Sequence, residues 1–155
     1  MVVDDDDATV TLVGEFLTRA GVSEVHGVSD ARDALRVIRE ADADLVVLDL
    51  RMPHVDGYEI LARLRDDEEA SPFLPVLVVT GDASPEARAR ALALEATDVL
   101  VKPLSMRATI QHVLALLRAR HESRPDPAAG SGPPAAGSGP PAAGAGPPAA
   151  AGART

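Results

Sequence analysis

The chain has 155 residues, enough for one domain, and a formal net charge of −9 at pH 7. Hydrophobic residues make up 46%, but the only aromatic ones are Phe16, Tyr58 and Phe73, so aliphatic side chains must build the core. The negative charge argues against direct binding to nucleic acid or to anionic lipids. The absence of cysteine excludes disulfides and thiolate chemistry and fits a reducing compartment.

The N-terminal residues lack the basic and apolar regions of a signal peptide, and no apolar stretch is long enough to span a bilayer. We therefore expect a cytoplasmic protein without a membrane partner.

Short β-branched runs alternate with longer amphipathic segments along most of the chain. Strands are predicted at 2–3, 24–28, 45–49, 76–80 and 99–102, and helices at about 7–20, 31–40, 57–68, 85–96 and 106–120. The runs 45–48 and 76–79 are continuously apolar, which is typical of central parallel strands covered on both faces. Five strand–helix units predict an α/β fold with a doubly wound parallel sheet.

Several helix ends are marked in the sequence. Gly21 is placed to end the first helix, and the run Ser84-Pro85-Glu86 is typical of a capped helix start. Ser105 is a candidate cap for the last helix. The first strand is predicted to be very short, because acidic residues follow Val3 directly.

From Glu122 onward a seven-residue unit, PPAAGSG, recurs with small changes. The Pro-Pro pairs interrupt helices and strands, and the segment has no large apolar side chain to bury. Residues 122–155 are therefore predicted to form a disordered tail or linker after a domain at 1–121. The chain then represents either a stand-alone domain with a tail or a domain separated from an output module.

Polar residues follow the predicted strands at their carboxyl ends, where ligands bind in open parallel sheets. These residues are Asp4, Asp5, Asp49, Thr80 and Lys102. Three carboxylates close together repel one another unless a cation lies among them, and hard oxygen ligands favour Mg²⁺. With the acids neutralised, Asp49 could attack phosphorus, while Thr80 and Lys102 contact the phosphoryl oxygens. Each residue alone has a simpler interpretation as a helix cap or a surface charge.

Four stretches together resemble the receiver domains of bacterial two-component response regulators. They are VVDDDDA, DLVVLDLRMPHVDGYEIL, PVLVVTGDAS and ATDVLVKPL, and the resemblance covers residues 1 to about 120. It implies a flavodoxin-like strand order, 2-1-3-4-5. It also implies that Asp49 is the phosphoacceptor and that Asp4, Asp5, Asp49 and the backbone carbonyl of Arg51 bind Mg²⁺.

The same resemblance assigns roles to the later motifs. Thr80 matches the hydroxyl that moves toward the phosphoryl group, and Gly81 matches a small residue that leaves the phosphate accessible. Lys102 and Pro103 match a Lys-Pro pair whose peptide bond is typically cis. Gly57 matches a glycine in the loop after the acceptor, where it is expected to supply backbone freedom.

One position departs from the family pattern. Three residues before the lysine the family usually has Tyr or Phe, whose ring turns inward on phosphorylation, but this chain has Val99. Valine has no ring to turn, so the phosphorylation chemistry is predicted to remain while the usual aromatic output switch is predicted to be missing.

Charged residues near the acceptor have less specific interpretations. Arg51 and Asp82 occupy positions that tune dephosphorylation in the family, or they pair with each other. Arg88 and Arg90 fit a solvated helix face better than a partner site. The histidines His26, His54, His112 and His121 show no metal-ligand spacing.

The sequence thus predicts a phosphoacceptor response regulator. A histidine kinase or phosphotransfer protein is the expected donor to Asp49, and an unknown downstream protein is the expected target. Two alternatives are a phosphorylation-independent interaction domain with the same fold and a receiver fragment of a larger regulator. A phosphohydrolase of the haloacid dehalogenase type is disfavoured, because Arg51 stands where such enzymes need a second acid. We expect no activity on an external substrate.

Overall fold

The computed structural model describes residues 1–66 and 74–123. Five parallel strands form one sheet in the order β2-β1-β3-β4-β5. They are β1 (Val2–Val3), β2 (Gly27–Val28), β3 (Val46–Asp49), β4 (Val76–Thr80) and β5 (Asp98–Val101). The predicted fold class and strand order are confirmed.

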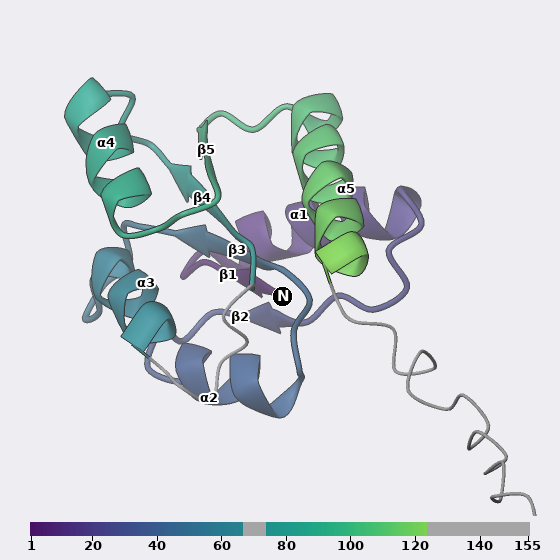
Figure 1. Cartoon of the computed structure of the whole chain (residues 1–155), viewed down its shortest axis with the longest axis horizontal. Helices are drawn as coiled ribbons and strands as arrows, with labels where there is room; N and C mark the ends of the chain where they lie inside the picture. Colours follow the sequence, from purple (N-terminus) through teal and green to yellow (C-terminus); the bar gives the residue numbers. More distant parts are fainter. Residues whose placement is uncertain (67–73, 124–155) are drawn as a thin grey trace, which may run out of the picture. The chain divides into compact units, whose positions relative to one another are not determined.

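The helices form two layers, one on each face of the sheet (Figure 1). Helices α1 (Asp7–Arg19) and α5 (Met106–Ser123) lie together on one face. Helices α2 (Ala34–Glu40), α3 (Gly57–Asp66) and α4 (Pro85–Ala93) cover the other.

Alternate residues of the central strands point into these two layers. In β3, Val46 and Leu48 belong to the hydrophobic cluster shared with α2, α3 and α4, whereas Val47 belongs to the cluster shared with α1 and α5. Leu77 and Val79 of β4 join the second cluster. Both central strands are buried along their whole length, which explains their continuously apolar sequences.

The edge strand β2 is shorter than predicted. A strand was expected at 24–28, but only Gly27 and Val28 form one, and they pair with Val2 and Val3. An edge strand has only one neighbour, so a two-residue β1 leaves the residues before Gly27 without a ladder to join. The strand predicted at 99–102 is observed one residue earlier, at 98–101.

The predicted helix ends are largely confirmed. The backbone of Gly21, with φ of 90°, follows α1 in the left-handed region, and the amide of Val22 donates back to the carbonyl of Leu17 at 3.0 Å. The Ser84 side chain accepts from the amide of Ala87 at 3.2 Å at the start of α4. Ser105 accepts similarly from Ala108 at the start of α5, at 3.4 Å.

Helix α4 ends at Ala93, three residues before the predicted end at 96. The reason is tertiary: Glu95 takes a left-handed conformation with φ of 61°, and its carbonyl accepts from the Arg65 side chain at 2.8 Å. Helix α2 also starts later than predicted, at Ala34, because the Asp30 side chain caps a turn at the amide of Arg32.

Helix α5 extends to Ser123, so its last two residues lie within the segment predicted as tail. The remaining predicted tail, and the predicted end of α3 at 67–68, lie outside the described residues. Among the residues described, no helix combines the length and the apolar character needed to cross a membrane.

Candidate functional site

The candidate site lies at the carboxyl end of the sheet, where four neighbouring strands end in polar residues. Asp4 follows β1, Asp49 ends β3, Thr80 ends β4 and Lys102 follows β5. The parallel order places β1, β3, β4 and β5 side by side, so residues far apart in sequence meet at one edge.

Three carboxylates gather at this edge. Oxygens of Asp4, Asp5 and Asp49 all lie within 4.8 Å of one another, an arrangement that could hold a metal ion. Asp4 and Asp49 are buried, whereas Asp5 is exposed to solvent. An all-carboxylate donor set of this kind suits a hard cation such as Mg²⁺. The donor chemistry therefore fits the predicted metal.

The four-aspartate run divides into two functions. The Asp4 carboxylate accepts from the amide of Asp6 at 2.9 Å and faces the cluster. Asp6 caps α1, accepting from the amide of Ala8 at 3.0 Å and from the Thr9 hydroxyl at 3.0 Å. Asp7 lies in the first helical turn, where negative charge is favourable. Half of the run thus builds the site and half starts the helix.

Lys102 is the cation that faces the acidic cluster. Its ammonium donates to Asp4 at 2.8 Å and lies 3.6 Å from an oxygen of Asp49. Burial alone would lower the pKa of Lys102, but its contacts with Asp4 and Asp49 raise it above the usual value. Lys102 is therefore held in its charged form between two buried carboxylates.

Burial raises the pKa of Asp49 above its ordinary value of 3.8, and the neighbouring charge of Asp4 adds to this effect. The charge of Lys102 acts in the opposite direction without cancelling it. The ionised Asp49 thus costs the folded state free energy at neutral pH.

Asp49→Asn is expected to stabilise the metal-free protein by about 1 kcal/mol at pH 7, because the amide removes the buried charge and its repulsion. A carboxyl with a raised pKa in the folded state destabilises that state above its unfolded pKa. The gain should therefore shrink as the pH is lowered toward 3.8. Urea unfolding of both proteins at several pH values measures it; an equal or lower stability of the variant at pH 7 would contradict the electrostatic argument.

Thr80 begins a chain of side-chain contacts that runs into α4. Its buried hydroxyl accepts from the amide of Asp82 at 3.0 Å, and the Asp82 carboxylate accepts from the amide of Ser84 at 2.9 Å. Ser84 in turn caps α4. Gly81 is exposed, and a Cβ atom built there would meet no other atom within 4 Å. Position 81, where the resemblance implies a small residue, thus has free space around it.

The loop after Asp49 packs back onto the acceptor strand. Arg51 and Asp56 form an isolated antiparallel bridge, and the amide of Gly57 donates to the carbonyl of Leu50 at 3.1 Å. The expectation that Gly57 supplies backbone freedom is wrong, since its φ is not positive. Glycine is needed there because a Cβ atom would collide with the carbonyl oxygen of Asp49 and with Cα of Leu50.

The Arg51 and Asp82 side chains form an ion pair at 3.2 Å between the loops that follow β3 and β4. Both side chains are at least one-third exposed, so the pair contributes little to stability. The predicted pairing of the two residues is confirmed, and their role in dephosphorylation stays a prediction. The role of the Arg51 backbone carbonyl as a metal ligand stays a prediction.

At β5, Val99 is buried in the cluster beneath α4, and the Lys102–Pro103 peptide bond is cis, as the resemblance implies. The Arg88 side chain donates to the carbonyl of Val99 at 2.9 Å and pairs with Asp98 at 3.2 Å. Arg88 is exposed, as predicted for a solvated face, and it also joins α4 to β5.

Sequence reasoning also missed contacts made by His112 and Arg90. His112 of α5 pairs with Asp98 at 2.7 Å, so Asp98 joins α5 to β5 as well. Arg90 lies 3.8 Å above the ring of Tyr58 and 3.8 Å from the Asp56 carboxylate. Their partners are distant in sequence, and no local pattern indicates the contacts.

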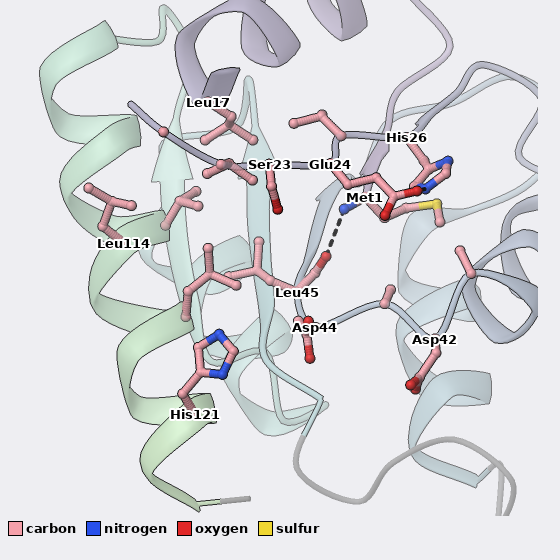
Figure 2. Close-up of a pocket in the computed structure, with 17 residues that line it drawn as sticks. Met1, Leu17, Ser23, Glu24, His26, Asp42, Asp44, Leu45, Leu114 and His121 are labelled. Carbon is pink, nitrogen blue, oxygen red and sulfur yellow. Dashed lines mark hydrogen bonds and ion pairs between the residues drawn. The ribbon is translucent and has the colours of Figure 1, made fainter. Parts of the chain in front are cut away.

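A separate pocket of about 300 Å³ opens at the opposite end of the sheet. Figure 2 shows it between the end of α5, which carries His121, and the residues that precede β1 and β3. The amino group of Met1 donates there to the carbonyl of Leu45 at 2.9 Å. None of the candidate site residues lines this pocket. The chemistry indicated by the carboxylates is therefore not located in it.

Comparison with known proteins gives consistent results. The family described as the response regulator receiver domain matches residues 1–114. The transcriptional regulatory protein HprR of Escherichia coli is 35% identical over 121 residues, which are 78% of this chain and 52% of HprR. The alkaline phosphatase synthesis transcriptional regulatory protein PhoP of Bacillus subtilis is 34% identical over 125 residues, covering 81% of this chain and 50% of PhoP.

Among solved structures, the chemotaxis protein CheY4 of Vibrio cholerae superposes with a TM-score of 0.68 and 30% identity. The match covers 74% of this chain and 94% of CheY4. The chain spans about half the length of the curated relatives given above. The match over residues 1–114, together with the sheet order and the acidic cluster at its carboxyl end, shows that this chain belongs to the response regulator receiver domain family.

Proposed function

We propose that this chain is a phosphoacceptor that receives a phosphoryl group from a histidine kinase or phosphotransfer protein on Asp49. The observation that carries the proposal is the position of Asp49 at the end of β3, buried and within 4.8 Å of the Asp4 and Asp5 oxygens. The nearby ammonium of Lys102 and hydroxyl of Thr80 complete the set of groups that phosphoryl transfer requires.

In the proposed reaction an Asp49 carboxylate oxygen attacks phosphorus and displaces the donor's imidazole, so that an acyl phosphate forms. Asp4, Asp5, Asp49 and the Arg51 carbonyl would hold Mg²⁺, which supplies positive charge against the phosphoryl oxygens. The Lys102 ammonium lies 3.6 Å from an Asp49 oxygen, close enough to contact a phosphoryl oxygen bound to Asp49. The Thr80 hydroxyl would turn away from the Asp82 amide and donate to a second phosphoryl oxygen. The chain thus modifies itself and acts on no external substrate.

The proposed output is contact with another protein through α4, β5 and α5. Three large apolar side chains on these elements are exposed by more than 40%: Leu92, Val101 and Met106. Exposed apolar surface is one of the features that mark protein interaction sites. The cytoplasmic location stays a proposal that fits this function.

A second form of output is favoured by the relatives. HprR and PhoP are named as transcriptional regulators, and this chain spans about half of each. A receiver of this kind could therefore act through a DNA-binding domain joined to it. The net charge of −9 makes direct DNA contact by the receiver itself unfavourable. We therefore still propose that the receiver domain itself does not bind nucleic acid.

The decisive experiment incubates the protein with Mg²⁺ and acetyl phosphate and measures its intact mass. Wild type should gain one phosphoryl group, and Asp49→Asn should gain none. Asp33→Asn is the matched control, because this exposed acid pairs with Arg36, lies outside the carboxylate cluster and should leave the gain intact. A folded wild type without added mass would sink the proposal and favour a phosphorylation-independent interaction domain.

A further inference from the structure

Tyr58 joins the start of α3 to the start of α4. Its backbone amide donates to the Asp56 carboxylate at 2.9 Å, and its hydroxyl donates to the carbonyl of Ala87 at 3.3 Å. Arg90, one turn further along α4, covers the ring at 3.8 Å from its centroid. Tyr58 is thus held by α4 at its hydroxyl and by the acceptor loop at its backbone amide.

The α3 end of this contact is anchored to the acceptor strand. Gly57, the residue before Tyr58, packs so closely on Asp49 and Leu50 that it has no room for a Cβ atom. Its amide also donates to Leu50. The start of α3 therefore cannot move without moving the backbone of Asp49.

The α4 end is connected to Thr80 by successive hydrogen bonds. The amide of Asp82 donates to the Thr80 hydroxyl, the amide of Ser84 donates to the Asp82 carboxylate, and the amide of Ala87 donates to the Ser84 hydroxyl. The carbonyl of Ala87 is the acceptor of the Tyr58 hydroxyl. An unbroken series of contacts thus leads from Thr80 to Tyr58.

We propose that Tyr58 is a positioning residue that couples α4 to the state of the Asp49 site. The proposal rests on the proposed function. When Thr80 turns toward a phosphoryl group, its hydroxyl leaves the Asp82 amide, and the loop that positions Ser84 and Ala87 loosens. The phenol of Tyr58 then loses its acceptor on α4. Val99 has no ring that could report the same change, so the aromatic readout is carried by α3 rather than by β5.

The composition of the chain makes this change directly measurable. Tyr58 is the only tyrosine and there is no tryptophan, so tyrosine emission and its quenching by acrylamide report on this side chain alone. We expect the quenching constant to rise when Mg²⁺ and beryllofluoride, a phosphoryl mimic, are added together, and to stay unchanged with Mg²⁺ alone. Fluorine NMR of the same samples shows whether beryllofluoride is bound.

The outcomes separate the two proposals. No bound beryllofluoride would contradict the phosphoacceptor function itself. Bound beryllofluoride with unchanged Tyr58 quenching overturns the coupling and leaves that function intact. A full response to Mg²⁺ alone also overturns it, because the signal would then follow metal binding rather than the phosphoryl mimic.

Ser84→Ala tests the connection at its middle. It removes one hydroxyl from the series and should reduce the beryllofluoride-dependent rise in quenching while beryllofluoride still binds. Ser105→Ala is the matched control, because Ser105 caps α5 in the same manner without touching the series. Equal responses in the two variants would show that Tyr58 is merely structural.

Tyr58→Phe provides a readout that a packing role would not change. The ring stays beneath Arg90, but the bond to Ala87 is lost. The amide NMR signals of α4 should then shift, without ligand, toward their positions in the beryllofluoride-bound wild type. Shifts confined to the immediate neighbours of Tyr58, in another direction, would overturn the coupling.

Discussion

Gly57→Ala is expected to lower the free energy of unfolding by about 3 kcal/mol, the upper end of the usual cost of overpacking. The added Cβ atom would collide with the backbone of Asp49 and Leu50, and backbone atoms cannot turn aside as a flexible side chain can. The strand and the start of α3 must separate to admit it. Urea unfolding followed by circular dichroism measures the loss.

Gly81→Ala is the matched control for this prediction. It introduces the same methyl group in the loop after β4, where nothing lies within 4 Å of the new atom. The φ of Gly81 is not in the left-handed region, so alanine should be tolerated or slightly stabilising. Similar stability losses for both variants would show that close approach to Asp49 is not what requires glycine at position 57.

Lys102→Met should destabilise the metal-free protein by about 2 kcal/mol and increase its stabilisation by Mg²⁺. The substitution leaves the side chains of Asp4 and Asp49, which are only 4% and 5% exposed, without their cation. Because the lysine side chain is itself 30% exposed, the cost falls below that of a fully buried pair. Thermal or urea unfolding over a Mg²⁺ titration gives both quantities.

The larger Mg²⁺ response follows from competition for the same carboxylates. In wild type the lysine ammonium already donates to Asp4, so an entering cation must share that carboxylate. In Lys102→Met the ammonium no longer occupies the carboxylates, so half-maximal stabilisation should require less Mg²⁺. Arg36→Met is the control, since its ion pairs with Asp33 and Glu40 are exposed. An unchanged Mg²⁺ response in Lys102→Met would show that the lysine and the metal do not compete.

Much of the fold follows from local patterns. The apolar runs of β3 and β4 are buried on both faces, and the signals at Gly21, Ser84 and Ser105 mark observed helix ends. Errors arose where an element depends on its neighbour. β2 is limited by the two residues of β1, and α4 ends where Arg65 holds the carbonyl of Glu95.

The site shows the same division between local and distant information. The sequence alone identified the strand-end residues Asp4, Asp49, Thr80 and Lys102, because each follows an apolar run that must be a strand. It could not separate the roles within the aspartate run, where Asp4 faces the carboxylate cluster and Asp6 caps α1. Nor could it give the reason for Gly57, which depends on contact with the preceding strand.

The sequence by itself therefore determined the fold class, the order of the elements and the residues at the acidic edge. Hydrophobic periodicity and turn residues act over a few positions, and they are visible without coordinates. Only the tertiary structure decided that the Lys102 ammonium lies between the carboxylates of Asp4 and Asp49. It also decided that Tyr58 connects the acceptor loop to α4. These contacts join residues separated by many positions, and their energies depend on distance and burial, which exist only once the chain has folded.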